Sequence, residues 1–338
     1  MRKAGYYILF LMGLLLTACE TEETDLYSPR ENFEALWKIM DEYYCFFEYK
    51  QIDWQEVYDR YSPQVHESMD QYELFDVLGE MLSELQDGHT NLISSFNTSR
   101  YWAWYEDYPA NFSSDILNNY LGKSNEYMQV GGIKYRTLNE GTIGYIYYGS
   151  FATGIGDSQL DYIFHYFKDC HGLIIDIREN GGGTLSNSDR IASRFLSEKT
   201  LVGYIQHKTG KGHAQFSEPY PVYLNPSERI HWTSPVVVLT NRRCYSAANN
   251  FVQKMSQMPQ VTIMGDRTGG GSGFPFHSEL PNGWSIRFSA CPMLDENKEH
   301  TEFGIDPDRL VQMTLKDSQQ GRDTLIETAI LHLLSSGE

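Results

Sequence analysis

A serine stands where an apolar run gives way to a helical pattern, in the segment Cys244-Tyr245-Ser246-Ala247-Ala248. The run SPVVVLT precedes this segment, and the stretch FVQKMSQM follows it. A serine at the start of a helix lies in positive potential from unpaired N–H groups, and this potential would stabilise an oxyanion. The Ala247 N–H would point toward the same spot. Ser246 is therefore either a nucleophile or a plain helix N-cap.

A histidine follows a second helical pattern, in the segment Leu85-Gln86-Asp87-Gly88-His89-Thr90. Neutral imidazole titrates near the working pH, so His89 could take a proton from a serine and later return it to a leaving amine. A histidine just past a helix end can instead be only a partner of the helix dipole. His89 is the candidate general base, and the dipole role is its alternative.

Two glycine-rich segments complete the residues that could do chemistry. Gly181, Gly182 and Gly183 come shortly after the run GLIID, and residues 265–273 hold five glycines. Glycines let backbone N–H groups approach a ligand closely because no side chain intervenes, although either segment could be only a mobile turn. The first segment is neither a phosphate-binding Walker loop nor a dinucleotide-binding fingerprint.

The elements that must position these residues alternate between strands and helices from residue 141 onward. The strand patterns are TIGYIYYGSF, GLIIDI, PVVVLT and VTIMG, and the helix patterns are SQLDYIFHYFK, SNSDRIASRFL and SAANNFVQKMSQM. This alternation predicts an α/β fold with a parallel sheet and helical crossovers. Ligand sites in such sheets lie beyond the carboxyl ends of the strands, where these glycines and Ser246 fall.

Residues 29–90 are predicted to form a helical subdomain. Ser28-Pro29-Arg30-Glu31 has a capping-box pattern with proline at the first helical position, and apolar residues then recur at helical spacing. A second helix is expected near residues 53–68, and a third, YELFDVLGEMLSELQ, is expected to end at Gly88. Residues 91–140 show weak periodicity, which favours short strands and loops.

The first 19 residues, MRKAGYYILFLMGLLLTAC, have the basic start and short apolar stretch of a signal peptide. The run Leu16-Thr17-Ala18-Cys19 resembles a bacterial lipobox, which implies loss of residues 1–18 and lipidation of Cys19. An ordinary secretory peptide is the alternative. The acidic segment 19–28 would then tether the protein to a membrane of the bacterial cell envelope, on the periplasmic side or the outer surface.

The 338 residues are 41% apolar, which is ample for a large core. Without residues 1–18 the chain keeps 25 basic against 45 acidic residues, a balance of −20 that argues against binding nucleic acid or anionic lipid by electrostatics. The four remaining cysteines lack metal-like spacing, and we expect buried free thiols. No histidine cluster has the spacing of a ligand set, so neither a metal nor another cofactor is predicted.

Five segments in this order and spacing resemble one family, the S41 serine peptidases, which include the C-terminal processing proteases and the tricorn protease core. These segments are DGHT, IDIRENGGG, CYSAANNF, GDRTGGG and GIDPDRLV, and the resemblance covers residues 30–315. It implies a Clp-protease/crotonase-like catalytic core in residues 141–338, with Ser246 as the nucleophile. It also implies an oxyanion hole made by the N–H of Ala247 and one from the glycine turn, at Gly181 or Gly182.

The processing-protease branch uses a Ser–Lys dyad, whose lysine lies in the loop that here has the sequence TGGGSG, without lysine. Lys254 lies eight residues beyond Ser246, about 12 Å along the predicted helix. Asn249 occupies the position where an S-x-x-K enzyme would have lysine. We therefore do not expect a lysine base.

The tricorn-like branch uses a histidine base, and His89 matches its position. In tricorn a glutamate acts through a serine placed just before the histidine, but this chain has Gly88 there. Glu302 is the candidate that orients the imidazole, and an exposed surface carboxylate is its alternative. Asp87 would cap or brace the loop.

A full PDZ module is not expected, because about 50 residues separate Thr90 from Gly141 and such a domain is larger. Recognition of substrate C-termini by strand addition to a PDZ domain is therefore not predicted.

These features predict a lipid-anchored serine endopeptidase that acts on peptides or unfolded protein segments. The alternative is a catalytically inactive protein of the same fold that binds a hydrophobic ligand or peptide. The missing lysine, the altered neighbour of His89 and the aromatic residues of 95–148 would allow that alternative: Tyr101, Trp102, Trp104, Tyr105 and Tyr108. Hydrolysis of a non-peptide ester or amide is a third interpretation.

Overall fold

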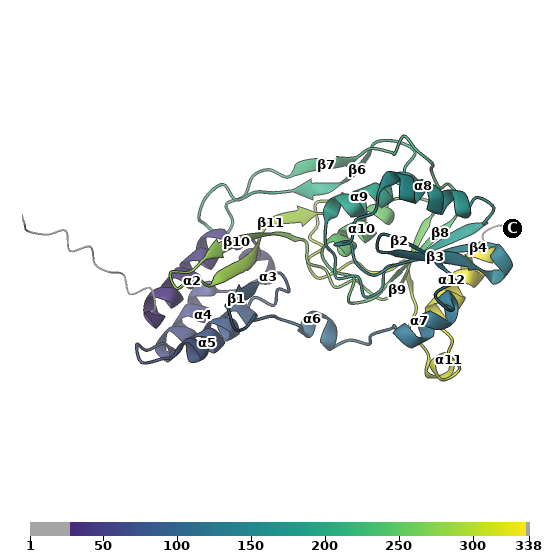
Figure 1. Cartoon of the computed structure of the whole chain (residues 1–338). Coiled ribbons are helices and arrows are strands. Elements are labelled where there is room, and N and C mark those ends of the chain that lie inside the picture. Colours follow the sequence, from purple (N-terminus) through teal and green to yellow (C-terminus); the bar gives the residue numbers. More distant parts are fainter. Residues whose placement is uncertain (1–27, 336–338) are drawn as a thin grey trace, which may run out of the picture.

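A seven-stranded mixed sheet forms the larger part of the computed structural model, which describes residues 28–335 (Figure 1). Its strand order is β12-β9-β8-β5-β4-β3-β2, and the five strands from β12 to β4 run parallel. The parallel sheet predicted from residue 141 onward is confirmed. The antiparallel β2 and β3 are short strands of the kind expected in residues 91–140. The bounds are β2 (Met128–Val130), β3 (Ile133–Leu138), β4 (Ile143–Tyr148), β5 (Gly172–Asp176), β8 (Val236–Thr240), β9 (Val261–Gly265) and β12 (Arg309–Leu310).

Helices cover both faces of this sheet. In β5, Leu173 and Ile175 belong to the core shared with α8, α9 and α10, whereas Ile174 belongs to the core shared with α7 and α12. Because both faces are buried, the strand sequences are continuously apolar and do not alternate. The helix bounds are α7 (Ser114–Leu121), α8 (Asp157–Tyr166), α9 (Leu185–Ala192), α10 (Ala247–Met255) and α12 (Thr324–Ser335), with the short α11 (Leu315–Gln319) before α12.

The N-terminal helices form the other end of the elongated molecule (Figure 1). Ser28 caps the first of them by accepting a hydrogen bond from the Glu31 N–H at 3.3 Å. The expected end of the third helix at Gly88 is wrong, because α5 ends at Ser83 and the left-handed φ of Gln86, 47°, stops it from continuing. The bounds are α2 (Pro29–Tyr43), α3 (Phe47–Lys50), α4 (Trp54–Tyr61) and α5 (Gln71–Ser83).

A five-stranded antiparallel sheet joins the two ends of the molecule, as Figure 1 shows. Its long strand β11 pairs with β1, β10 and β6, and β6 pairs with β7. Ile286, Phe288 and Ala290 of β11 complete the core of the N-terminal helices. The bounds are β1 (Asn91–Ile93), β6 (Thr200–Ile205), β7 (Tyr220–Leu224), β10 (Gly273–Glu279) and β11 (Ser285–Leu294), and the short α6 (Ala103–Glu106) follows β1.

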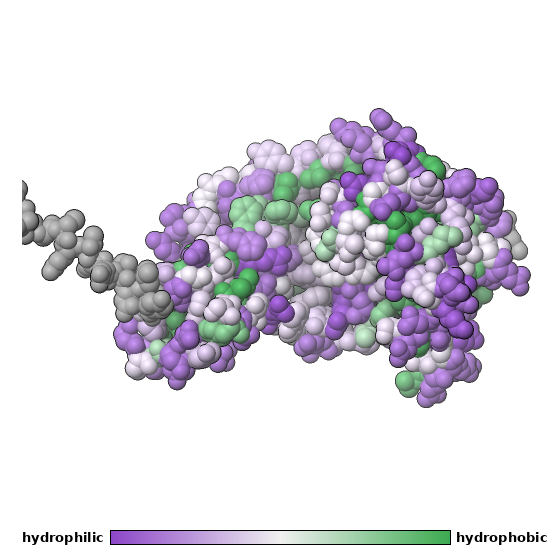
Figure 2. Space-filling model, in the orientation of Figure 1, coloured by the Kyte–Doolittle hydropathy of each residue, from purple (hydrophilic) through white to green (hydrophobic). Residues whose placement is uncertain are grey.

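The signal peptide, Cys19 and the tether up to residue 27 lie outside the described residues. Between residues 28 and 335, no helix is long and apolar enough to cross a membrane, and no three acidic, histidine or cysteine side chains are grouped to hold a metal ion. The four cysteines of this part are buried and free, as predicted: Cys45, Cys170, Cys244 and Cys291. Figure 2 shows hydrophilic residues over most of one face, with hydrophobic residues confined to small patches.

Candidate active site

Ser246 lies on a sharp turn that joins the segment after β8 to the first residue of α10. Its backbone angles, φ 56° and ψ −118°, lie in a region that is strained for any residue except glycine. Its side chain makes no capping hydrogen bond, so the interpretation of Ser246 as a plain N-cap is wrong. The Ser246 N–H donates to the Gly270 carbonyl at 2.8 Å, which holds the turn. Strained strand-to-helix turns of this kind present the nucleophilic serine in α/β hydrolases.

The glycine turn 181–183 packs directly against Ser246. A Cβ built on Gly182 would lie only 2.8 Å from Ser246 Cβ and 2.9 Å from the Ala247 nitrogen, so only glycine fits there. Within residues 28–335, the N–H groups of Ala247 and Gly181 donate no hydrogen bond. The Gly182 N–H donates to Asn180 Oδ1 at 2.9 Å. Of the three expected oxyanion donors, the N–H groups of Ala247 and Gly181 are therefore unpaired in this part of the chain, and that of Gly182 is already bonded.

Replacing Gly182 by alanine should lower kcat/KM for peptide cleavage by about 10²-fold or more. The added methyl group would lie 2.6 Å from the Tyr245 carbonyl oxygen, and φ at this position is 95°. Backbone atoms cannot rotate aside as a side chain can, so the Ser246 turn must shift. Kinetics with a fluorogenic peptide check this, with Gly154→Ala as the control because its Cβ would meet nothing within 4 Å. Full activity of the Gly182 variant would contradict the close packing.

His89 lies behind the serine turn, against the neighbouring tyrosine. Its ring is 4.9 Å from the Tyr245 ring, centroid to centroid. The imidazole is 3% exposed, and its Nδ1 has no hydrogen-bond partner in the described chain. Burial lowers the pKa of His89 to about 4, so the ring is neutral at pH 7 and can accept a proton.

The structure places His89 against Tyr245, next to Ser246 in the chain, but no hydrogen bond joins His89 to Ser246 among the described residues. In enzymes without a bound ligand, catalytic hydrogen bonds are often long and tighten only in the complex. The geometry therefore fits a base that still has to move toward the serine.

Asp87 braces the loop that carries His89, as expected. Its Oδ1 accepts the His89 N–H at 2.8 Å, and the Tyr245 hydroxyl lies 3.5 Å from the same oxygen. Burial acts to raise the pKa of Asp87, but the charge of Lys50 and the His89 N–H hold it below its ordinary value. Asp87 is therefore a charged group fixed beneath the site.

Glu302 is buried at 4% exposure, so the interpretation of an exposed surface carboxylate is wrong. Its carboxylate forms an ion pair with Lys50 at 3.0 Å and accepts the Ser272 N–H at 2.8 Å. Within residues 28–335 it makes no hydrogen bond to His89. Burial raises the pKa of Glu302 to about 7, and the nearby Lys50 acts against this rise. The expected orienting carboxylate therefore lies near the site, with a lysine as its partner.

Lys50 is a site residue that the sequence analysis missed. Its ammonium group donates to the carbonyls of Leu85 and Gln86 at 3.1 and 3.2 Å, directly before the loop that holds His89. It thus ties Glu302 to that loop from the end of α3. The sequence around Lys50 does not indicate that this lysine is buried. Its side chain is only 2% exposed because tertiary packing covers it.

Neither of the two positions considered for a lysine base supplies one, as predicted. Lys254 is hydrogen-bonded to Asn250 and Asp189, near the end of α10 that is far from the serine. Asn249 donates to the Thr301 hydroxyl at 3.2 Å and lines the cavity.

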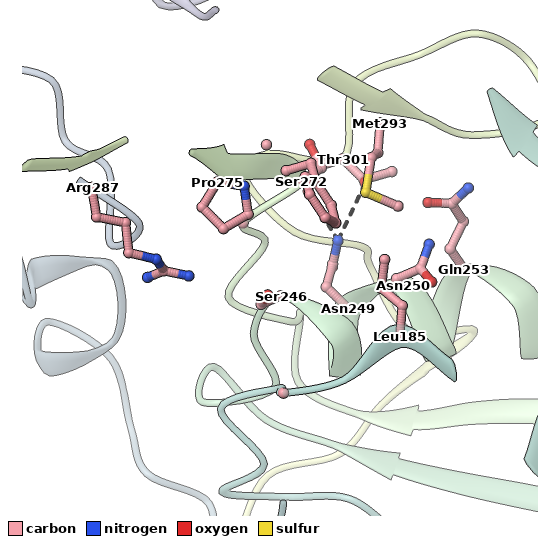
Figure 3. Close-up of a pocket in the computed structure, with 14 residues that line it drawn as sticks. Leu185, Ser246, Asn249, Asn250, Gln253, Ser272, Pro275, Arg287, Met293 and Thr301 are labelled. Carbon is pink, nitrogen blue, oxygen red and sulfur yellow. Dashed lines mark hydrogen bonds between the residues drawn. The ribbon is translucent and has the colours of Figure 1, made fainter. Parts of the chain in front are cut away.

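A cavity of about 190 Å³ opens beside Ser246 (Figure 3). One wall is polar and comes from α10, and the start of α9 and β11 add apolar side chains. Arg287 of β11 reaches in from the opposite side. The lining includes Leu185, Asn249, Asn250, Gln253, Ser272, Pro275, Arg287, Met293 and Thr301. This volume suits a side chain of a bound peptide.

One aromatic residue of the segment after β1, Trp104, packs onto the site, whereas Trp102 and Tyr108 are exposed. Trp104 stacks on Tyr245 with ring centroids 4.2 Å apart, and Tyr105 and Tyr108 lie over neighbouring arginines. A Cβ built on Gly88 would lie 2.7 Å from Trp104 Nε1. The indole therefore occupies the space that a serine before His89 would need, which explains the glycine at this position.

Comparisons with known proteins show which family this chain is similar to. The family model of peptidase family S41 matches residues 142–311, and the model of the tricorn protease C1 domain matches residues 27–83. A predicted peptidase from Parabacteroides merdae, known from a crystal structure, is 64% identical, with a TM-score of 0.87 over 91% of this chain and 97% of that one. Mature CPAF has a similar fold, with a TM-score of 0.70 at 12% identity over 92% of this chain and 98% of its own.

One curated relative is a predicted tricorn-like protease C-terminal subunit from Sulfurisphaera tokodaii. It is 24% identical over 204 residues, which make up 57% of this chain and 21% of the relative. The chain spans about a fifth of the length of this relative and of two matching chlamydial proteins.

Proposed function

Because the chain belongs to peptidase family S41, we propose that it is a serine endopeptidase that cleaves peptides or unfolded protein segments at Ser246. The observation that carries this proposal is the strained turn of Ser246, which leaves the hydroxyl without a capping bond and the Ala247 N–H unpaired beside it. Such a turn stores strain that a merely structural serine does not need.

The proposed reaction is acyl transfer in two stages. The Ser246 hydroxyl attacks the peptide carbonyl while neutral His89 takes its proton, and the N–H groups of Ala247 and Gly181 stabilise the oxyanion. Collapse of the tetrahedral intermediate breaks the C–N bond, and His89 protonates the leaving amine. A water molecule, deprotonated by His89, then releases the acyl group from Ser246.

Glu302 and Lys50 would act in this reaction as positioning residues. Lys50 donates hydrogen bonds to the two carbonyls that precede Asp87, and its ion pair with Glu302 holds the lysine in place. The pair would therefore fix the position of the loop that carries His89. Asp87 then fixes the loop through the backbone N–H of His89. In this arrangement Glu302 acts on the base through Lys50 and the loop backbone.

A fluorophosphonate probe tests the proposal, because it phosphonylates an activated serine. We expect the mature chain to be labelled at Ser246 and the Ser246→Ala variant to remain unlabelled. Absence of labelling in the folded wild-type chain would contradict the proposal.

The same experiment separates the peptidase from an inactive protein that binds a hydrophobic ligand or peptide. The observation that favours this second candidate is the absence of a hydrogen bond between His89 and Ser246 in the described chain. An inert Ser246 together with saturable binding of a peptide would support the binding protein.

We also propose that Cys19 is lipidated and anchors the enzyme in the bacterial cell envelope, on the basis of the signal sequence and its Leu16-Thr17-Ala18-Cys19 run. Cys19→Ser should move the protein from the membrane fraction to the soluble fraction and abolish incorporation of labelled palmitate, as seen on gels. A matched Cys45→Ser variant should stay in the membrane fraction. Wild-type protein that incorporates no fatty acid would contradict lipidation.

A further inference from the structure

Arg287 is the only charged side chain lining the cavity beside Ser246, as far as residues 28–335 show. It lies in β11, opposite Asn91 of β1 and His277 of β10. Figure 3 shows its guanidinium group pointing into the space in front of Ser246 and Pro275. The side chain therefore faces the position that a peptide would occupy during cleavage.

This arginine has no partner for its charge. In the described chain, Arg287 makes neither a hydrogen bond nor an ion pair, although it is half-buried. The two fully buried arginines, Arg178 and Arg194, each pair with two aspartates. Removing a guanidinium group from water without an anion costs free energy, which a bound anion would offset.

The surroundings of Arg287 favour a carboxylate as that anion. The polar groups that share its cavity are neutral amides and hydroxyls, so no acidic side chain of the lining competes for the guanidinium group. The carboxylate of Asp87 attracts the guanidinium group of Arg287, but it does so without forming an ion pair or a hydrogen bond with it in the described chain. The flat fork of an arginine matches the two oxygens of a carboxylate.

Because the whole chain is strongly acidic, the binding of an acidic group in the cavity depends on the charge of Arg287. With a net charge of −18, the protein repels acidic peptides at long range. An acidic group that reaches the cavity can therefore be held only by a local positive charge, and Arg287 is the one facing Ser246.

We propose that Arg287 determines specificity by binding a substrate carboxylate next to the bond cleaved at Ser246. The carboxylate is either an acidic side chain or the free C-terminus of the peptide. This inference rests on the proposed function, because it assumes that a peptide lies across Ser246.

Peptide binding to the uncleaving Ser246→Ala chain tests the proposal without relying on activity. The probes are fluorescein-labelled decapeptides of one uncharged sequence, with a C-terminal carboxylate or carboxamide and with either Glu or Gln near the C-terminus. We expect the Kd of the peptides that carry the preferred carboxylate to be about 10- to 100-fold lower than that of the carboxamide peptide with Gln, the one probe with neither carboxylate. The preference for the free C-terminus or for Glu identifies the source of the carboxylate.

Adding Arg287→Met should abolish this preference while the carboxamide peptide with Gln binds as before, which also shows that the variant is folded. Arg287→Lys should retain part of the preference, because it keeps the charge but lacks the fork. Arg309→Met, an exposed arginine of β12 outside the cavity, is the matched control and should change nothing.

Equal binding of all four peptides, no binding of any, or a preference that survives Arg287→Met would each overturn the role of Arg287. None of these outcomes bears on the nucleophile, because labelling of Ser246 by the fluorophosphonate is measured separately. If labelling fails while Arg287 still selects carboxylates, the hydrolase proposal falls and a carboxylate-binding site remains.

Discussion

Replacing Ser246 by alanine should lower the rate of peptide hydrolysis by roughly 10⁴-fold or more, with the melting temperature nearly unchanged. The substitution removes only the hydroxyl oxygen, which makes no capping bond, so the fold loses no stabilising contact. The rate loss is large because the oxyanion donors alone cannot replace a covalent nucleophile. Hydrolysis of casein or a fluorogenic peptide and thermal unfolding measure the two effects.

Ser256→Ala is the matched control for this prediction. Ser256 lies at the other end of α10, and its hydroxyl bonds only the Gln253 carbonyl, at 3.0 Å. We expect full activity for this variant. Full activity of Ser246→Ala, in contrast, would remove Ser246 from the reaction.

Replacing Lys50 by methionine should destabilise the protein by about 3–5 kcal/mol. Both partners of the Lys50–Glu302 ion pair have side-chain exposures of 2%, so the variant leaves a buried carboxylate without its cation. The carbonyls of Leu85 and Gln86 also lose their donor, which should loosen the His89 loop and reduce activity. Chemical denaturation at pH 8 measures the loss in free energy of unfolding.

The stability of the Lys50→Met variant should depend on pH, and the pKa of Glu302 determines the direction of this dependence. Burial already raises the pKa of Glu302 to about 7, and loss of Lys50 would raise it further. As the pH falls, Glu302 therefore takes up a proton in the folded variant before it does so in the unfolded chain, where its pKa has the ordinary value. Its stability should therefore recover as the pH falls toward 5, and the penalty should be largest above neutral pH.

Two variants control for the Lys50 substitution. Lys211→Met breaks the ion pair with Glu42, but Lys211 is 72% exposed, so a much smaller loss of stability is expected. The double variant Lys50→Met/Glu302→Gln removes the stranded charge and should regain part of the stability. If Lys50→Met costs no more than Lys211→Met, the buried pair does not hold the loop.

The sequence was sufficient to predict the central sheet and the place of the serine. Strands that are apolar on both faces, such as VVVLT, alternate with helical patterns, and this fixes a parallel sheet. The rule that ligand sites lie beyond strand ends then places the glycine turn and Ser246 together, as observed in the contact of Gly182 with Ser246. These features depend on local pattern and simple topology.

The residues that complete the site depend on long-range packing, and no local pattern indicates them. β11 carries Ile286 and Phe288 into the core of the N-terminal helices, while Arg287 between them faces the cavity. The alternation of apolar and charged residues along β11 shows which face lines the cavity only once the strands and helices that pack against β11 are known. Lys50 likewise looks like a surface lysine until the fold brings it to Glu302, more than 250 residues later.

A crystal structure of the mature chain after reaction with a fluorophosphonate tests the central claim most directly. We predict phosphorus bonded to the Ser246 oxygen, a His89 ring nitrogen about 2.6–3.2 Å from that oxygen, and a phosphonyl oxygen about 2.7–3.1 Å from the Ala247 nitrogen. An adduct on another residue, or an imidazole that stays out of reach of the phosphonylated serine, would contradict the account.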